Sequence, residues 1–442
     1  MKKPFSGSDL FCNRDIFLRV TSALFLSSVT VFFFAVLFYL LFLAANAYTG
    51  QTVRFFYPRI FSDFTQVAYY SMRRDAYLLE GGSSYSAISL LLMLPFACIF
   101  RSALRSASYS ADWSQPNMEI LSSPCFWIAF LLYQAVAFSL LYVLLRRLLQ
   151  KRPANGAFLC FTFSAGSIYA LIRGNTLLLP LAFVLLFLNL YDSKKALYRE
   201  IGLLFFALAG AMKLYPLFFG CVLLHQKRWG AAVRVGLYFL ALYFLPLFCY
   251  EGGFSAYSGN LLVFIGGENH LADGSNISFA SLLYKIFSVF FADEVPAWAE
   301  IFSVAAGGIL LLFLALAATV TKSRLRQFVL SLCAVSLVAP IGYFYVTVFS
   351  LIPAAEYLKT YDLRTQAENK KFFFFCLALG FYPIYAAWLF PVACILLTGL
   401  GISVIRRVFR AGEVKAYFSR NSSCRLPHLQ RQAISAEQEC DQ

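Results

Sequence analysis

The sequence predicts an all-α polytopic membrane protein, from its composition and from the spacing of its apolar runs. Of the 442 residues, 60% are hydrophobic and only 13% are charged, and the mean hydropathy is +0.69. A water-soluble protein of this length could not cover so much apolar surface. Nothing shows the alternation of a membrane barrel strand, and lipid requires backbone groups to be hydrogen-bonded internally. The spans are therefore expected to be helices.

The apolar runs indicate roughly ten to twelve transmembrane helices, because each span needs about 20 residues. The last two runs contain breaks near Pro340 and Pro391, so each is long enough for two spans. We treat residues 1–410 as one membrane domain and expect residues 411–442 to be a disordered tail. The runs are 16–45, 85–100, 124–145, 156–173, 176–191, 200–226, 235–250, 298–321, 327–358 and 372–405.

Basic residues predict how the chain is oriented in a plasma membrane. The formal net charge is +15, and Lys and Arg concentrate in cytoplasmic loops. Lys2, Lys3 and Arg14 precede the core of the first span, which places the N-terminus in the cytoplasm and the loop of Asp63 outside. A basic cluster from Arg406 onward places the C-terminus in the cytoplasm too. We expect contact with membrane lipid there and no nucleic-acid partner.

The route of the chain from residue 85 to residue 226 has two alternatives. If every apolar run crosses once, the basic cluster 146–152 faces outward, against the charge bias. In the second alternative, run 85–100 does not cross and run 200–226 forms a hairpin of half-helices around Lys213. That arrangement places the basic cluster in the cytoplasm and Arg173 on the outer side. The sequence leaves both alternatives open.

Asp63 is the first candidate for chemistry, because acidic residues are scarce in this chain. It begins a short amphipathic stretch that follows the first span. The simpler explanation is that Ser62 or Asp63 caps a helix from residue 64 to about 80, which stabilises a helix by about 1 kcal/mol. Arg73 lies in the same loop and is a candidate cation for substrate binding.

Lys213 is the second candidate, because apolar residues flank it on both sides. A lysine at mid-membrane costs about 2.5–3.5 kcal/mol on insertion scales, so it needs a partner such as an anion or a carboxylate. Pro216 is expected to break the helix there. Between two other apolar runs, Arg173 and Asn175 could contact a phosphate or a sugar, although Gly174-Asn175 also suits a tight turn.

The outer segment 251–297 is rich in polar residues, including His270, Glu268 and Asp273. They lack metal-ligand spacing, so we expect a solvated loop and no metal site. Asn276 begins a glycosylation sequon, Asn276-Ile277-Ser278, and residues 277–292 could lie along the interface as an amphipathic helix. The eleven cysteines are scattered without a C-x-x-C pair, and no Walker loop, G-x-G-x-x-G, G-x-S-x-G or H-E-x-x-H motif is present. We expect no cofactor, and any donor substrate should arrive in the membrane.

Several of these motifs, in this order, resemble the polyprenyl-phosphate-sugar-dependent glycosyltransferases of the GT-C fold, and most closely glycosyltransferase family 87. The most specific of them is the lysine-proline motif. The sequence departs from the family at Tyr345, which stands where a late Pro-x-x-Trp-x-His-Tyr motif has its His. The matching elements are Asp63-Phe64, Tyr69-Tyr70, Gly81-Gly82, Tyr85, Pro95, Gly174-Asn175, Lys213-Leu214-Tyr215-Pro216, Lys227-Arg228-Trp229 and Asn276-Ile277-Ser278.

The resemblance implies a GT-C-like bundle whose outer loops carry the site. It implies inverting transfer of a hexose, with mannose as the first candidate, from a polyprenyl-phosphate donor to a glycan or glycolipid acceptor. Asp63 would be the general base, and the substrates would contact Lys213, Arg173, Asn175, Tyr85, Arg73, His270, Asn276 and Tyr345. A transporter or flippase of lipid-linked sugars remains the alternative, since an intramembrane lysine and broken helices suit it too. A ligase or polymerase of surface polysaccharide that uses diphosphate donors is a third possibility.

Overall fold

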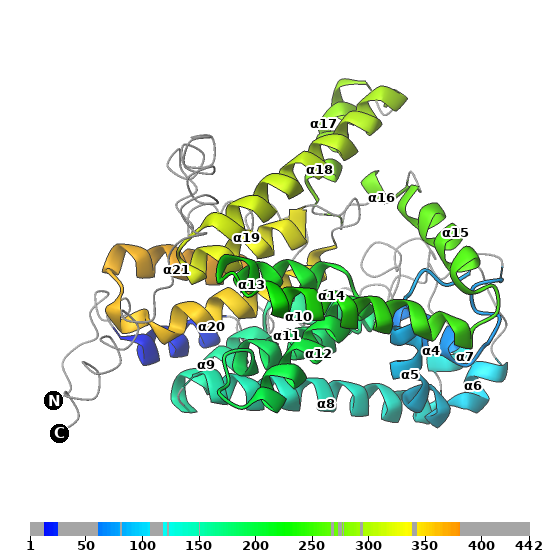
Figure 1. The fold of residues 1–442 in the computed structure, drawn as a ribbon, viewed down its shortest axis with the longest axis horizontal. Coiled ribbons are helices and arrows are strands. Elements are labelled where there is room, and N and C mark those ends of the chain that lie inside the picture. The colour runs from blue at the N-terminus through cyan, green and yellow to red at the C-terminus, as the bar shows by residue number, and fades with distance from the viewer. Residues whose placement is uncertain are drawn as a thin grey trace, which may run out of the picture. The chain divides into compact units, whose positions relative to one another are not determined.

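The computed structural model describes residues 13–24, 61–79, 82–106, 118–121, 123–149, 151–266, 269–272, 276, 278–291, 295–337 and 343–380. Within these ranges the regular structure is helical, and the only β pairing is one antiparallel bridge between Asn276 and Tyr343. Figure 1 shows the order of the elements along the chain. The expected tail 411–442 and most of the first and last apolar runs lie outside the described residues.

Residues 14–24 form the first described helix. The labelled helices are α4 (Ser62–Ser71), α5 (Ala87–Ile99), α6 (Arg101–Ser106), α7 (Met118–Leu121), α8 (Pro124–Leu148), α9 (Lys151–Thr162), α10 (Ala165–Arg173), α11 (Leu178–Leu190), α12 (Ala196–Met212), η1 (Tyr215–Gly220), α13 (Cys221–His225), α14 (Trp229–Phe244), η2 (Leu245–Cys249), α15 (Gly253–Gly266), α16 (Asn269–Ala272), α17 (Phe279–Phe290), α18 (Ala297–Val320), α19 (Arg324–Leu337), η3 (Phe344–Ser350), α20 (Leu351–Lys359), η4 (Tyr361–Leu363) and α21 (Gln366–Gly380).

Three helical stretches in the described ranges are long and apolar enough to cross a membrane: Pro124–Leu148, Trp229–Cys249 and Ala297–Val320. A fourth span is possible if Pro153–Thr162 and Ala165–Arg173, which meet at a bend of 52°, are counted together. This is fewer than the ten to twelve that the apolar runs indicated. Several runs fold into helices of 10–17 residues, such as α5 and α11, because turns and prolines divide them.

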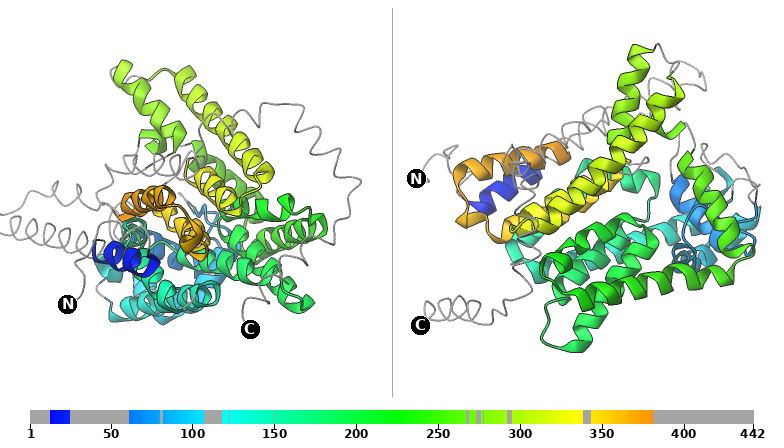
Figure 2. Two further views of the ribbon diagram at one scale, coloured as in Figure 1. Left: turned by 90° about the vertical axis from the view of Figure 1, so that its left-hand side faces the viewer. Right: turned by 45° about the horizontal axis from the view of Figure 1, so that its top comes forward.

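Helices α8 and α11 lie side by side and run in the same direction (Figure 2). The Tyr133 hydroxyl donates to the Thr176 carbonyl at 2.9 Å, and the Asn189 amide approaches the Leu144 carbonyl at 3.5 Å further along both helices. The α9–α10 segment between them must therefore run the opposite way. The ends of α8 and α11 bring Arg146 and Asp192 to one end of the bundle, which we call the basic end.

The segment that contains Lys213 forms a hairpin. A Cβ added at Gly210 would meet the Leu217 side chain, and one added at Gly220 would meet Phe206. The two contacts follow in reverse order along the two segments, so α12 packs antiparallel to the helical segment η1–α13. Helix α12 ends because Lys213 is extended, with φ −148° and ψ 128°. The hairpin returns to the basic end, where Arg228 forms an ion pair with Asp192 and donates to the Tyr191 carbonyl at 3.0 Å.

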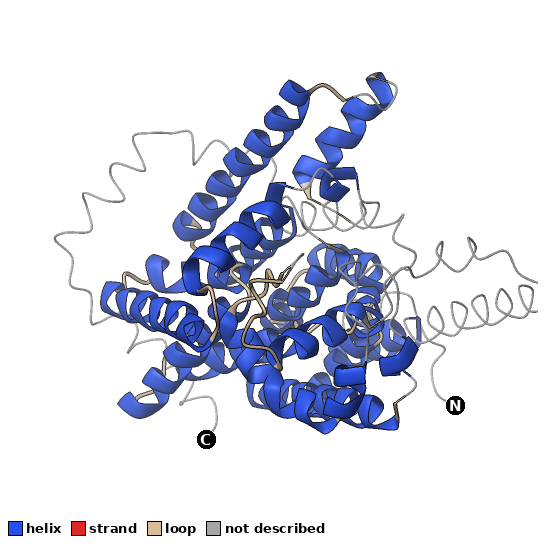
Figure 3. Ribbon diagram, turned by 90° about the vertical axis from the view of Figure 1, so that its right-hand side faces the viewer, coloured by secondary structure: helices blue, strands red, loops and turns tan. Residues whose placement is uncertain are grey.

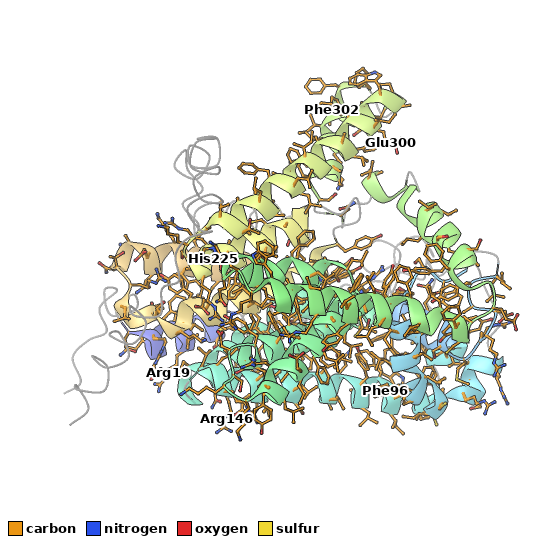
Figure 4. The ribbon with its side chains drawn as sticks, in the orientation of Figure 1. Arg19, Phe96, Arg146, His225, Glu300 and Phe302 are labelled. Atoms are coloured by element: carbon orange, nitrogen blue, oxygen red, sulfur yellow. The ribbon has the colours of Figure 1, made fainter. Side chains whose placement is uncertain are left out.

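This geometry agrees with the second of the two sequence-based alternatives. The helix α5 begins beside the tip of the hairpin, where the Ser89 hydroxyl donates to the Met212 carbonyl at 3.1 Å. It ends beside the start of α8, with the Phe100 and Phe126 rings 5.5 Å apart, so it does not reach the basic end. Figure 4 shows Arg19 and Arg146 together at one end of the bundle and Phe96 of α5 away from them.

Helix α17 covers most of the stretch predicted to be amphipathic, residues 277–292. It packs along the longer helix α18, and Figure 3 draws both among the blue helices. Ser278 caps α17 by accepting a hydrogen bond from the Ser281 backbone N–H at 3.1 Å. Large apolar side chains such as Val289, Ile301 and Phe302 are exposed on this pair, as expected for helices that face lipid.

Candidate active site

The first helix of the site, α4, does not use Asp63 as a cap. The helix runs from Ser62 to Ser71, shorter than the stretch 64–80 that the sequence suggested, and its N-cap residue is Phe61, with no side-chain cap hydrogen bond. Phe61 adopts a left-handed conformation with φ 54°, a strained geometry for a bulky residue. Its backbone N–H donates to the Ile172 carbonyl at 2.8 Å, which ties the start of α4 to the end of α10.

Aromatic packing fixes the position of α4. The Phe64 side chain is fully buried, and the rings of Phe130 and Tyr133 lie 5.3 and 5.7 Å from it in edge-on contact. On the opposite side, Gly174 ends α10 with φ +66°, and a Cβ there would lie 2.9 Å from the Cβ of Phe64. Only glycine combines this conformation with so close an approach. The two chain segments are therefore held in one fixed relation.

Asp63 is bound by the two polar residues that flank this glycine. The Arg173 guanidinium donates to Oδ1 of Asp63 at 2.8 Å, and the Asn175 amide donates to Oδ2 at 2.5 Å. The side chains of Asp63 and Arg173 are only 8% and 12% exposed. The Asn175 Oδ1 accepts from the Leu177 backbone N–H at 3.1 Å, which fixes the amide orientation. Gly174-Asn175 is thus a turn, as the simpler explanation proposed, and its Asn175 also binds the Asp63 carboxylate.

Lys213 lies close to this cluster. It stands at the tip of the hairpin, and its Nζ is 4.8 Å from the centre of the Tyr85 ring. The charges of Asp63 and Arg173 both act on the ammonium. Among the residues that the structure describes, Lys213 Nζ has no hydrogen bond and no ion pair within salt-bridge distance. A cation–π contact alone compensates weakly for desolvating an ammonium.

Tyrosine rings surround the charged groups. Tyr345 is 8% exposed and stacks on Tyr169 with ring centres 6.0 Å apart, and it lies 5.5 Å from the Tyr343 ring. The Arg173 guanidinium lies 5.7 Å from the centre of Tyr343. Asp63 and Tyr215 both act electrostatically on the Tyr345 phenol. Tyr345, one of the predicted site residues, therefore belongs to the same cluster as Asp63.

The cluster has an excess of positive charge and of hydrogen-bond donors. Arg173 and Lys213 are set against one carboxylate, Asp63. The Nε of Arg173 is buried and has no hydrogen-bond partner in the described part of the chain. Both cationic side chains are donors without acceptor capacity. The arrangement therefore has the properties of a site for an anion rich in acceptor oxygens, such as a phosphate.

Arg73 has its own partners. Its guanidinium forms two hydrogen bonds with the Asp75 carboxylate, at 2.9 and 2.7 Å, and a third with the Tyr69 hydroxyl at 3.0 Å. This pairing holds the pKa of Asp75 below its usual range. Both side chains are more than a third exposed, so the pair is screened by solvent. No contact joins Arg73 to Asp63 within the described ranges.

Of the two remaining predicted residues, Asn276 reaches the cluster through the backbone and His270 lies in α16. Asn276 is 1% exposed, pairs with Tyr343 in the isolated bridge, and accepts from the Ser278 backbone N–H at 2.9 Å. An asparagine so buried and bonded forms a structural turn, which does not fit a glycan acceptor. No group of three His, Cys, Asp or Glu side chains that could hold a metal occurs in the described part of the chain.

Sequence reasoning missed three members of the cluster: Tyr169, Tyr215 and Tyr343. Tyr215 could have been found, because it stands between Lys213 and Pro216 in the lysine-proline motif. Tyr343 stands two residues before Tyr345. Tyr169 carries no local signal, since an aromatic residue in an apolar helix is ordinarily a packing residue.

A family model supports the sequence resemblance. The model of glycosyltransferase family 87 matches residues 84–340, which is more than half of the chain. The match includes Tyr85, Arg173 and Lys213, whereas Asp63 and Tyr345 lie just outside it. Comparisons with curated proteins and with solved structures gave no significant match. The family match and the apolar helices together show that the chain belongs to glycosyltransferase family 87 and is a membrane glycosyltransferase.

Proposed function

We propose that this glycosyltransferase moves a hexose from a polyprenyl-phosphate donor to a glycan or glycolipid acceptor at the outer face of the plasma membrane, with inversion at the anomeric carbon. Mannose is the first candidate sugar. The observation that carries the proposal is a cluster in which one buried carboxylate, Asp63, lies with two cations, the nearly buried Arg173 and the partly exposed Lys213. In this proposal the bundle is GT-C-like, both termini are cytoplasmic, and the Asp63 end of the bundle faces outward.

Asp63 acts as the general base on the acceptor hydroxyl. Both of its oxygens are engaged, but a carboxylate has about four lone-pair sites, so a further proton can be accepted. The acceptor oxygen forms a bond to the anomeric carbon while the bond from that carbon to the phosphate oxygen breaks. The hydroxyl proton passes to Asp63, and the lipid phosphate leaves with the bonding electron pair. A single displacement of this kind inverts the configuration.

Arg173 and Lys213 stabilise the charge that develops on the leaving phosphate. A phosphate is a good leaving group and needs no acid to protonate the sugar oxygen, but donors placed where charge develops are worth much in a site that excludes water. The phosphate competes with Asp63 for the guanidinium of Arg173. Binding of the donor therefore weakens the Arg173–Asp63 ion pair and leaves the carboxylate a better base.

An apolar groove beside the hairpin supports a lipid-linked donor. Its volume is about 370 Å³. Leu217 and Phe218, which follow the tip of the Lys213 hairpin, line it together with α14 residues such as Val235 and Phe239 and with Ala318 of α18. Lys213 is not part of the lining, so an isoprenoid chain in this groove would reach a phosphate at Lys213 past Leu217, four residues further along the chain. The family assignment argues against the transporter alternative, since a transporter would form no glycosidic bond.

The test compares purified wild-type protein with Asp63→Asn, using a polyprenyl-phosphate hexose as donor. Because a positioned general base contributes roughly 10²–10⁴-fold, turnover should fall by that factor. Asp192→Asn is the matched control, because it removes a carboxylate that pairs with an arginine, Arg228, at the basic end, and it should keep its turnover. Asp63→Glu keeps a carboxylate and should retain more activity than Asp63→Asn. Near-normal turnover of folded Asp63→Asn would eliminate Asp63 as the base.

A further inference from the structure

Tyr215 has a buried hydroxyl without a hydrogen-bond partner among the residues that the structure describes. Three other buried tyrosine hydroxyls show the ordinary arrangement. Tyr133 donates to the Thr176 carbonyl at 2.9 Å, Tyr77 donates to the Tyr85 carbonyl at 2.9 Å, and Tyr357 donates to the Asn369 side chain at 2.9 Å. Most buried polar groups in proteins are bonded in this way, so an exception needs an explanation.

The hydroxyl is held in place by its surroundings. Tyr215 begins η1 directly after the hairpin tip, and Pro216 follows it in the first turn of that helix. The edge of the Phe349 ring packs against the phenol ring at 5.7 Å and 90°. A side chain held in this way cannot easily turn its hydroxyl to water, and the unliganded protein loses the stabilisation that a partner would give.

The hydroxyl belongs to the Asp63 cluster. Tyr215 stands two residues after Lys213 at the hairpin tip, and its ring contacts Phe349 of η3, the helix that also contains Tyr345. The charge of Asp63 also acts on the Tyr215 phenol. The cluster thus contains three groups that can donate and lack an acceptor among the described residues: the Tyr215 hydroxyl, Arg173 Nε and Lys213 Nζ. A ligand made of acceptor oxygens satisfies all three, whereas a sugar hydroxyl brings a donor of its own.

We propose that the Tyr215 hydroxyl donates a hydrogen bond to a phosphate oxygen of the lipid-linked donor, beside Lys213. This inference rests on the proposed function and adds a residue to its phosphate site. The hydrogen bond is charge-assisted, because its acceptor carries a negative charge. Tyr215 binds the phosphate in the ground state and keeps the bond as charge develops during transfer.

The experiment measures binding of farnesyl phosphate to detergent-purified Tyr215→Phe, with farnesol and inorganic phosphate as separate probes. Removing the hydroxyl should weaken farnesyl phosphate binding by roughly tenfold to a hundredfold, the loss expected for a hydrogen bond to a charged group. Farnesol binding should not change. The thermal midpoint of the unliganded variant should equal or exceed that of the wild type, because the variant lacks the unsatisfied hydroxyl.

Tyr133→Phe is the matched control. It removes a tyrosine hydroxyl that already has a partner, Thr176, so it should lower the thermal midpoint and leave farnesyl phosphate affinity unchanged. This opposite pattern separates loss of a ligand contact from loss of a structural hydrogen bond.

The outcomes that overturn the inference are distinct from those that overturn the proposed function. Equal affinity of wild type and Tyr215→Phe for farnesyl phosphate would overturn the inference alone, as would a lower thermal midpoint of unliganded Tyr215→Phe. If the wild type binds farnesyl phosphate no better than farnesol, both the inference and the proposed phosphate site fail. Binding of inorganic phosphate that depends on Tyr215 would support the hydrogen bond and show that the lipid chain is not needed for it.

Discussion

Removing Asp63 should destabilise the protein more than removing Arg173. The two charged groups are 2.8 Å apart and nearly buried, and at an effective dielectric constant of about 20 their attraction is about 6 kcal/mol. Desolvation offsets part of this, and removal of one partner of a buried pair typically costs about 3–5 kcal/mol. Asp63→Asn leaves the nearly buried Arg173 guanidinium without its only anionic partner among the described residues, so its cost should lie in that range. Arg173→Gln leaves the carboxylate with the hydrogen bond from Asn175.

The cost of Arg173→Gln should therefore be about 2 kcal/mol, near the value of one hydrogen bond to a charged group. In the double variant both buried charges of the pair are gone, so its cost should fall short of the sum of the two by at least about 1 kcal/mol. The assay is unfolding in mixed micelles with increasing SDS fraction, followed by the fluorescence of the five tryptophans. Additive costs, or a larger cost for Arg173→Gln than for Asp63→Asn, would refute this account of the cluster.

Three further predictions concern neighbouring groups. Lys213→Met should weaken binding of prenyl phosphates by tenfold or more, which corresponds to a lost charged contact of about 1.4 kcal/mol or more. The thermal midpoint should not fall, because the substitution removes a desolvated cation. A clear loss of stability would contradict that reasoning. Gly174→Ala should cost about 1–3 kcal/mol in unfolding free energy and reduce turnover, because φ is +66° and the new Cβ would press on Phe64, whereas an unchanged unfolding curve would show that the turn relaxes freely. Because the pKa of Asp75 is lowered by Arg73, the pair stabilises the protein above the pKa of the unfolded carboxyl, and this contribution disappears as pH falls through the lower folded value. Asp75→Asn should then slightly lower the thermal midpoint at pH 7, and this difference should shrink as pH falls below the unfolded value of about 4. A difference that does not change with pH would argue against the pair.

The sequence predicted the helical class and pointed to charged residues that the structure brings together, better than it predicted the helices themselves. The scarcity of acidic residues pointed to Asp63, and the cost of placing a lysine among apolar residues in lipid pointed to Lys213. Both arguments need only the sequence and no contact between distant residues. Within the described residues fewer runs form one long helix than expected, since an apolar run does not show where a helix ends inside it. The extended residue at the tip of the hairpin, Lys213, divides such a run.

Other parts of the site depend on contacts between residues distant in the chain. Nothing local shows that both oxygens of Asp63 are bound, because Arg173 and Asn175 are more than a hundred residues away. Arg73 was a candidate for substrate binding because it is close to Asp63 in sequence. In the structure it forms an ion pair with Asp75 instead. The choice between the two routes of the chain also needed three-dimensional contacts, those that bring Arg228 to Asp192.

The most direct test of the proposed reaction is the configuration of its product. Purified protein in liposomes would be given a polyprenyl-phosphate mannose of known anomeric configuration, labelled with ¹³C at the anomeric carbon, together with a glycolipid acceptor. The product would be analysed by NMR for the configuration at that carbon. The account predicts a new glycosidic bond with inverted configuration and release of the polyprenyl phosphate. Retained configuration, or movement of the intact lipid-linked sugar across the bilayer without a new bond, would contradict it.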